Sequence, residues 1–407
     1  MLRQRAIFSA FRYPDFFWFW WSYFLSNIGS WMQAVAQGWL LYELTQSPLV
    51  LGVFSLFRSS LLLAFFFLGG LIADRWDRRL LMIWIQIISL LSALILGFLT
   101  TLAIVQVWHI MVLGALNSTV WAFEQPVRHS LIPQLVKRED LPNAIALNSI
   151  VWQGAGLLGP SLVGFLVDWI HIDGCFYINA LSYLCVVAAL LRMHIPRLAE
   201  AGSNCIAQSI SDGFTYIHRE RLIFLLLITT SLFNIFGRSY LTLLPVIAKD
   251  VLQVGASGLG FIAAAPGLGT IIGSLAVAAF AQGEVKRNIL VILLLGYASS
   301  LILFTSTSHV QTAFGALVVT GALSIAFDTL VSTIIQLTVN DAYRGRVMGF
   351  HGMASAGLRE FGGVQAGFLA EWLSAGFAIN AGAVIVALVA LFFLTPRLRR
   401  ISRDECL

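Results

Sequence analysis

The chain has 407 residues, of which 58% are hydrophobic and only 11% are charged. Soluble domains contain roughly 45–50% apolar and about 25% charged residues, so this composition excludes an ordinary soluble protein and indicates one embedded in lipid. The net charge of +5 is too small to indicate nucleic-acid binding, and we expect no nucleic-acid partner. Four scattered cysteines lack metal-ligand spacing, so we expect no metal and no cofactor.

Apolar runs of about 20 residues, long enough to cross a bilayer, recur along the chain. Six precede residue 194, near 16–42, 49–73, 80–104, 108–132, 143–167 and 174–193. Six more follow a polar stretch, near 221–248, 256–281, 288–306, 311–337, 346–370 and 376–395. We predict an all-α membrane protein with twelve transmembrane helices in two six-helix repeats. The predicted domains are an N-terminal bundle (1–193), a cytoplasmic linker (194–218), and a C-terminal bundle (219–407) that ends in a short basic cytoplasmic tail.

The basic residues give these spans an orientation. With the N-terminus in the cytoplasm, 21 of the 25 Lys and Arg fall in cytoplasmic segments and one, Lys249, on the opposite side. This split is the one that the positive-inside rule predicts. We therefore expect a multi-pass protein of the cytoplasmic (inner) membrane with both termini in the cytoplasm.

The two halves also resemble each other in sequence. Residues 164–169 (Gly-Phe-Leu-Val-Asp-Trp) align with 367–372 (Gly-Phe-Leu-Ala-Glu-Trp), and Leu51-Gly52 aligns with Leu259-Gly260. Ser130 and Gln134 align with Ser332 and Gln336 in the same way. Such duplication favours a rocking transporter with a site near the middle of the membrane.

The loop after the second span carries a recognisable motif. Residues 70–79 read Gly-Leu-Ile-Ala-Asp-Arg-Trp-Asp-Arg-Arg, which resembles the Gly-x-x-x-Asp-Arg-x-Gly-Arg-Arg signature of the major facilitator superfamily, with Asp77 in place of the second Gly. Residues 26–48, 144–149 and 344–348 resemble the branch of that superfamily that contains the enterobactin exporter and related drug and siderophore efflux proteins. The resemblance implies gating roles for Gly70, Asp74, Arg75, Arg78, Arg79, Arg344 and Arg346.

The fifth span contains a helix-packing motif that is similar to the exporter motif Gly-x-x-x-Gly-Pro-x-x-Gly-Gly of the superfamily. Its members are Gly156, Gly159, Pro160 and Gly164. Small residues let helices approach closely and proline kinks a helix, so generic helix packing is the alternative. The fourth span lacks the basic residue of the exporter-type Arg-x-x-x-Gly motif.

Ionisable side chains inside spans are costly and mark candidate functional sites. We nominate Asp328, Glu124 and Glu360 for proton coupling, with Arg238 as a partner of Asp328. Polar or aromatic faces at helical spacing predict that a cavity is lined by Arg58, Asn234, Arg238, Arg359, Gln33, Gln37, Trp121 and Trp152. The alternatives are hydrogen bonds between helices for the polar stripes, an intrahelical Glu124–Arg128 pair, a purely structural Arg238–Asp328 pair, and a structural role for His351.

We predict a secondary active transporter, a proton-coupled exporter of a small siderophore-like or drug-like molecule by alternating access. No phosphate-binding loop for ATP is found in the sequence. The alternative is a membrane-embedded enzyme or a lipid flippase on a transporter fold, although no hydrolase motif is found and we expect no enzyme. The expected partners are the small-molecule substrate, protons and membrane lipid, and the chain is expected to be a monomer.

Overall fold

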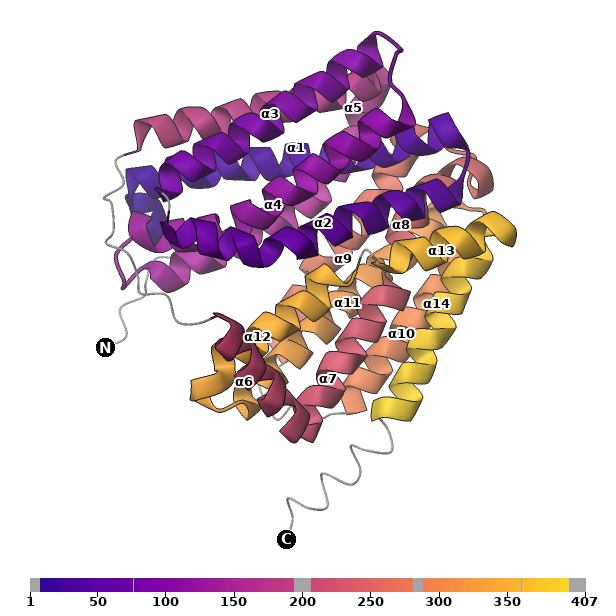
Figure 1. Ribbon diagram of the computed structural model, residues 1–407. Coiled ribbons are helices and arrows are strands. Elements are labelled where there is room, and N and C mark those ends of the chain that lie inside the picture. Colours follow the sequence, from indigo (N-terminus) through magenta and orange to yellow (C-terminus); the bar gives the residue numbers. More distant parts are fainter. Residues whose placement is uncertain (1–7, 76, 194–205, 281–287, 360, 395–407) are drawn as a thin grey trace. The chain divides into compact units, whose positions relative to one another are not determined.

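The computed structural model describes residues 8–75, 77–193, 206–280, 288–359 and 361–394. All its regular elements are helices (Figure 1). They group into two compact units. Unit 1 includes residues 256–264 from the second half of the sequence, and unit 2 includes residues 46–59 from the first half. Unit 1 is Met1–Thr45, Ser60–Ala201 and Ala256–Ala264, and unit 2 is Gln46–Ser59, Gly202–Gly255 and Ala265–Leu407.

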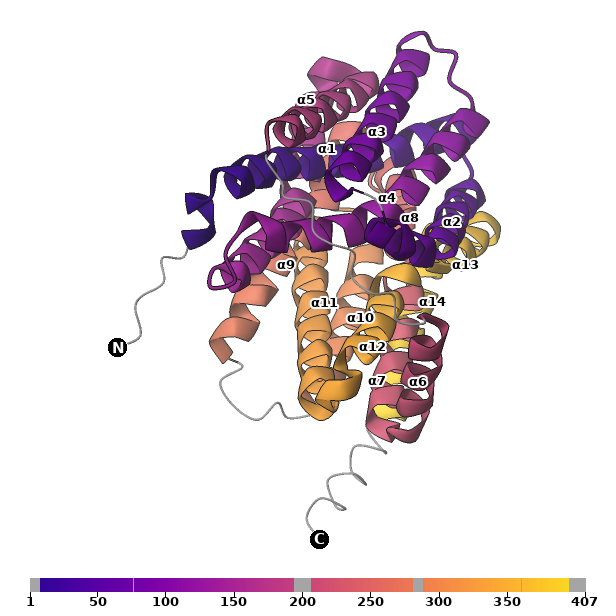
Figure 2. The same ribbon diagram turned by 60° about the vertical axis from the view of Figure 1, so that its left-hand side comes forward.

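Unit 1 is built around the long helices α1 and α5. Its elements are η1 (Ser9–Arg12), α1 (Pro14–Thr45), α3 (Arg78–Thr101), α4 (Val107–Leu135), α5 (Leu141–Arg192), most of α2 (Pro48–Arg75) and the start of α9 (Ala256–Phe280). Helix α5 packs along α1 and α3 (Figures 1 and 2). It joins the fifth and sixth predicted spans and is broken at His171, whose φ of 55° is left-handed.

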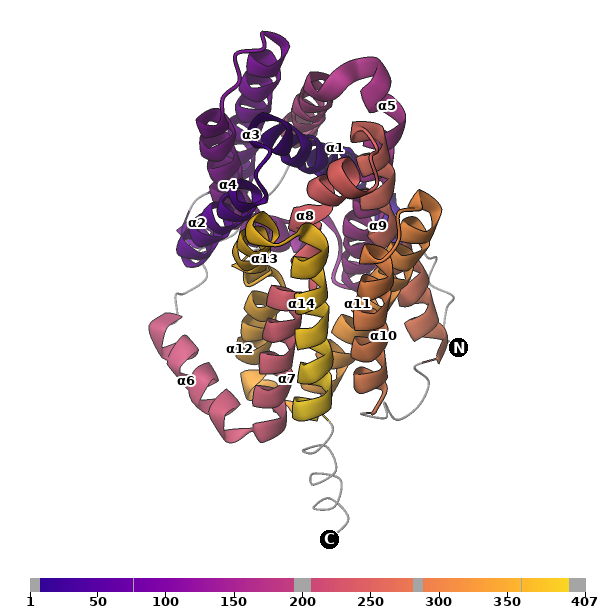
Figure 3. The ribbon, with the colours of Figure 1, turned by 90° about the vertical axis from the view of Figure 1, so that its right-hand side faces the viewer.

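Unit 2 contains the first part of α2, the rest of α9 and the remaining helices. They are α6 (Ile206–Arg219), α7 (Arg221–Leu232), η2 (Phe233–Gly237), α8 (Tyr240–Val246), η3 (Ile247–Val251), α10 (Asn288–Thr305), α11 (Val310–Thr338), α12 (Asp341–Gly352), η4 (Met353–Gly357), α13 (Phe361–Trp372), α14 (Ala375–Val389) and η5 (Ala390–Leu394). Helix α10 packs against α11 and α14, and α6 lies beside α12 (Figure 3). The second half of the predicted linker is thus the helix α6, and its first part, 194–205, lies outside the described residues.

Eight of the described helical segments are long and apolar enough to cross a membrane. They include α5, which covers two predicted spans. Outside this set are α1 and α4, which bury many polar side chains, and the interrupted segment α12–η4–α13. The all-α membrane fold is therefore confirmed, whereas the count of twelve spans stays a prediction.

The sequence repeat reappears as the same helix crossing in each unit. In unit 1, Gly260 of α9 lies against Gly164 of α5, and a Cβ on Gly260 would come 2.7 Å from the Pro160 carbonyl oxygen. In unit 2, a Cβ on Gly52 of α2 would lie 2.6 Å from the carbonyl oxygen of Gly363 in α13, and Gly367 packs on the same stretch of α2. Because no larger residue fits, both crossings depend on glycine.

Candidate functional site

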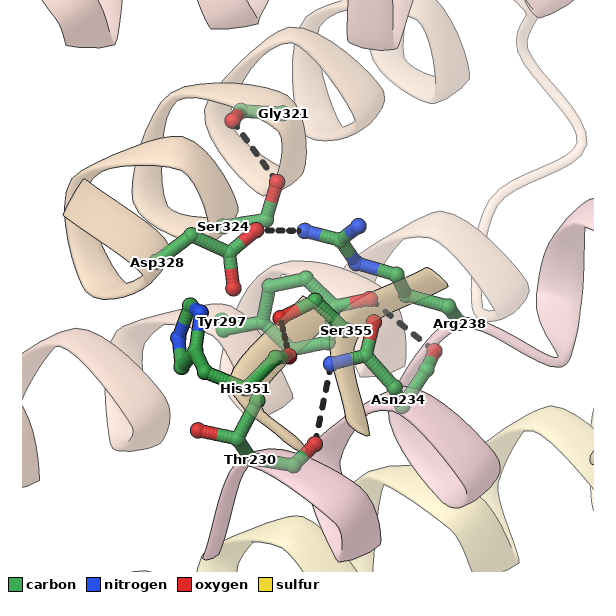
Figure 4. A network of polar contacts seen from close by, with 10 residues as sticks. Thr230, Asn234, Arg238, Tyr297, Gly321, Ser324, Asp328, His351 and Ser355 are labelled. Carbon is green, nitrogen blue, oxygen red and sulfur yellow. Dashed lines mark hydrogen bonds and ion pairs between the residues drawn. The ribbon is translucent and has the colours of Figure 1, made fainter. Parts of the chain in front are cut away.

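The central feature of unit 2 is a half-buried ion pair between two helical segments. Arg238 follows the π-helix η2, and its guanidinium donates to Oδ2 of Asp328, which projects from the middle of α11 (Figure 4). Their side chains are 17% and 20% exposed. The structure thus forms the Arg238–Asp328 pair that the polar stripes of these segments suggested.

The chain is folded locally so that Arg238 can reach Asp328. The α7 helix turns into the π-helix η2 and then breaks at Arg238, which has φ −88° and ψ 0°. Beside the break, the hydroxyl of Tyr297 in α10 donates to the Gly237 carbonyl at 2.9 Å. The Phe233 ring lies 5.4 Å from the guanidinium carbon of Arg238, a cation–π contact. Short π-helical segments are frequent at functional sites.

Most hydroxyl and amide donors around the pair are satisfied by their own helices. Ser324 donates to the Gly321 carbonyl at 2.9 Å, Ser355 to the His351 carbonyl at 2.7 Å, and Asn234 to the Thr230 carbonyl at 2.9 Å. These bonds favour a local structural role for Ser324 and Ser355.

Four polar atoms of the same cluster are buried without any hydrogen-bond partner. They are Oδ1 of Asp328, Oδ1 of Asn234, Oγ1 of Thr230 and Nε2 of His351. Buried polar groups are nearly always paired, and an unpaired one costs about 1–3 kcal/mol. Each of these atoms can still hydrogen-bond water or a polar group of a substrate, so the cluster is the candidate site of unit 2.

A second cluster of ionisable and aromatic residues lies in unit 1. Arg128 of α4 is only 1% exposed, and its guanidinium donates to Asn148 at 2.7 Å and to Gln125 at 2.5 Å. It also lies 5.1 Å from the Tyr23 ring and 5.7 Å from the Trp152 ring. The guanidinium of Arg128 therefore donates to neutral amides. An intrahelical pair would require it to donate to Glu124 instead.

Other predicted cavity residues of unit 1 lie near this cluster or bridge helices. Trp121 packs edge-on against Trp152, with ring centroids 6.1 Å apart. Glu124 is buried and lies within the electrostatic reach of Arg128. Gln33 accepts from Asn179 at 2.7 Å, and Gln37 donates to the Ile110 carbonyl at 3.3 Å. For the stripe of α1 the structure thus favours hydrogen bonds between helices.

The remaining cavity candidates belong to unit 2. Arg58 lies over the ring of Phe54 at 5.4 Å, and Arg359 follows η4 and is partly exposed. Glu360 lies outside the described residues.

The predicted gate is described only in part. Gly70, Asp74 and Arg75 are in the last turns of α2, where the side chains lie outside the described residues. The Asp77 side chain accepts from the backbone N–H groups of Arg79 and Leu80 and so caps α3. This cap accounts for an aspartate at the position where the motif has its second glycine.

The basic residues of the predicted gate contact neighbouring helix ends or residues of their own helix. Arg79 donates to the Leu190 and Leu191 carbonyls at 2.7 Å each, at the end of α5. Arg78 begins α3. In α12, Arg344 pairs with Asp341, and Arg346 lies 5.4 Å from the Tyr343 ring.

The packing motif of α5 faces α1 along part of its length. A Cβ on Gly159 would lie 2.5 Å from the Trp31 Cβ and 2.8 Å from the Ile28 carbonyl oxygen, whereas one on Gly156 would meet the Trp31 ring at 3.7 Å. Gly164 and Pro160 form the crossing with α9 described above.

Sequence reasoning missed three groups that shape these clusters. Two of them contact Arg128, namely Tyr23 and Asn148, and the third, Tyr297, bonds the backbone next to Arg238. A search for charged residues does not find them, because their side chains are neutral. Asn148 lies 20 residues from Arg128, and no helical period links the two.

The helical fold and the family match together identify a multi-pass membrane transporter of the major facilitator superfamily. The chain belongs to the transmembrane secretion effector family, whose model matches residues 5–406. It is 24% identical to the staphyloferrin A transporter of Staphylococcus aureus over 93% of this chain and 96% of that protein. It is 22% identical to macrolide efflux protein A of Enterococcus faecalis over 70% of this chain and 89% of that protein.

Solved structures show the same fold. A bacterial homologue of the human lysosomal transporter Spinster has a TM-score of 0.78 at 14% identity, covering 94% of this chain and 96% of that one. The nucleoside transporter NupG has a TM-score of 0.70 at 16% identity, covering 93% and 98%. These relatives and neighbours are all transporters, which agrees with the expectation that the chain is not an enzyme.

Proposed function

We propose that this transporter exports a small organic molecule of the drug or siderophore type in exchange for protons, by alternating access. The family description and the names of two relatives, a siderophore transporter and a macrolide efflux protein, support export and this class of substrate. Duplicated halves support alternating access.

The observation that carries the proton coupling is the Arg238–Asp328 pair with its unpaired second carboxylate oxygen. A carboxylate in a medium of low dielectric is stable as an anion only while a cation or several donors compensate it. If transport separates the two residues, Asp328 takes up a proton, and it releases the proton when they meet again. Glu124 and Glu360 are the competing carriers, and a purely structural pair is the alternative.

Everted membrane vesicles test this coupling. Vesicles energised to an acidic interior receive a panel of macrolides, lipophilic cations and carboxylate siderophores, and a pH-sensitive dye reports proton loss. We expect at least one solute to collapse the pH gradient in vesicles that contain the transporter but not in vesicles from the host alone. Uptake of a solute without proton movement would contradict the coupling, and no uptake of any of the three classes would contradict the substrate class.

The proposed topology places both termini and the linker in the cytoplasm of an inner-membrane monomer, with the two bundles at 1–193 and 219–407. Its support is the charge split of the sequence. In a cysteine-free background, an impermeant maleimide added to intact cells should label Lys249→Cys and leave Ser203→Cys unlabelled. The reverse pattern would overturn the orientation.

A further inference from the structure

The start of α2 is held by a side chain from the end of α13. The hydroxyl of Ser47 donates to Oε2 of Glu371 at 2.7 Å, and the backbone N–H of Leu49 donates to the same oxygen at 3.2 Å. The N–H of Val50 donates to the Ser47 hydroxyl oxygen at 3.4 Å. Pro48, the first residue of α2, has no N–H to satisfy. The first turn of α2 is therefore capped jointly by its own serine and by a carboxylate from another helix.

Close packing of two helices brings this carboxylate into place. Gly367 lies one turn before Glu371, and a Cβ on it would come 2.5 Å from the Pro48 carbonyl oxygen. One turn earlier, a Cβ on Gly363 would come 2.7 Å from the Ser55 hydroxyl oxygen. The backbone of α13 thus lies directly on the first two turns of α2, and Glu371 extends the crossing to the helix end.

The repeat-related crossing in unit 1 has no such cap. The counterpart of Glu371 is Asp168, which is one methylene shorter, and the alignment of Leu51-Gly52 with Leu259-Gly260 places Gly255 opposite Ser47. A glycine has no hydroxyl to donate. Among the described residues, no hydrogen bond joins Asp168 to the start of α9. The two crossings therefore share their glycine packing but differ in this polar contact.

The contact between Glu371 and α2 is suited to breaking and forming again. The Glu371 side chain is exposed, so water can take over its hydrogen bonds when the two helices part. While they are together, the partial positive charge of the helix start favours a carboxylate there. Helix α2 comes from the first half of the sequence and α13 from the second. A rocking motion of the two halves therefore has to break these bonds.

We propose that Glu371 is a latch that holds α2 and α13 together on the outer side of the membrane and releases them when the transporter opens outward. This inference deepens the proposed alternating access and rests on it, and it takes the outer side from the proposed topology. Because the α5–α9 crossing lacks the cap, the energetic barrier that a polar contact adds to outward opening is concentrated at α2 and α13.

Cysteine accessibility in intact cells tests the latch without any transported solute. In a cysteine-free background, Ser55→Cys places a thiol within the crossing, where Ser55 is only 7% exposed, and an impermeant maleimide is added from outside. We expect Glu371→Ala to raise the labelling rate about fivefold, the effect of losing one helix cap. Glu371→Gln, whose amide oxygen can still accept both bonds but carries no charge, should raise it less. Asp168→Ala, the repeat-related control, should leave it unchanged.

Each outcome decides for or against the latch. An unchanged rate in Glu371→Ala, an equal rise in Asp168→Ala, or no labelling of any variant from either side of the membrane would overturn it. A rise that occurs only in everted vesicles would support the latch and overturn the proposed orientation. Because the assay needs neither solute nor gradient, a failure of proton-coupled export leaves its result unaffected. Glu371→Gln replaces Glu371→Ala if the latter does not reach the membrane, and an unchanged rate would again overturn the latch.

Discussion

The two buried arginines of this transporter, Arg128 in unit 1 and Arg238 in unit 2, are held in opposite ways. Arg128 is almost fully enclosed, donates to two neutral amides and lies between two aromatic rings. Arg238 is more exposed and pairs with one oxygen of a carboxylate whose other oxygen has no partner. The hydrogen bonds of Arg128 go to groups that are not ionised and cannot take up a proton. Arg238 is bonded to the Asp328 carboxylate, which can. This difference favours unit 2 over unit 1 as the half in which a proton is taken up and released.

The largest expected effect on stability is that of Arg128→Ala. It leaves the Asn148 and Gln125 side-chain oxygens without their donor and removes the side chain between Tyr23 and Trp152. We expect a loss of about 3 kcal/mol, seen as a clearly lower thermal unfolding temperature in detergent. Arg138→Ala, on the exposed surface, is the control. Equal unfolding temperatures for the two variants would mean that Arg128 does not hold unit 1 together.

The next effect concerns the ion pair itself. Arg238→Ala leaves the half-buried Asp328 carboxylate without its cation. We expect this to cost about 2 kcal/mol, less than for a fully buried pair, because solvent reaches both side chains. The double variant Arg238→Ala/Asp328→Ala removes both charges and should recover much of that loss. A double variant less stable than Arg238→Ala would show that the two side chains stabilise the fold independently.

A smaller effect is expected for Tyr297→Phe. It removes the one hydroxyl that donates to the Gly237 carbonyl while keeping the ring that packs on Phe233. The expected cost is about 1 kcal/mol, together with weaker proton coupling because Arg238 is less well positioned. Tyr183→Phe, which loses a comparable hydroxyl contact to Ser30 in unit 1, should cost a similar amount without affecting coupling. Equal coupling in the two variants would contradict a positioning role for Tyr297.

The sequence predicts the membrane fold well because lipid imposes strong rules on composition and charge. Arg238 and Asp328 were predictable as partners because each lies on a polar stripe and a lone charge in a span needs compensation. The repeat aligns Gly52 with Gly260 and Gly164 with Gly367, but the crossings that these glycines form, Gly52 with Gly367 and Gly164 with Gly260, were not predicted from it.

The details around the arginines were not predictable by the same reasoning. Helical spacing favoured Glu124 as the partner of Arg128, but packing of α4 against α5 brings the Asn148 amide to it instead. The π-helix η2 shifts the helical period just before Arg238, and no residue pattern in Phe233–Gly237 indicates it. Whether a histidine ring has a partner is likewise decided by packing, as for His351.

The central claim is that unit 2 couples transport to protons through the Asp328 carboxylate. The most direct test is to measure transport by the Asp328→Asn variant in proteoliposomes. The solute is one that moved in the vesicle panel, measured both as accumulation driven by a pH gradient and as exchange of labelled for unlabelled solute without a gradient. The account predicts that accumulation is lost while exchange persists, because the neutral amide keeps the shape of the site but carries no proton. If Asp328→Asn still concentrates the solute with an unchanged pH dependence, the claim is wrong and Glu124 becomes the next candidate.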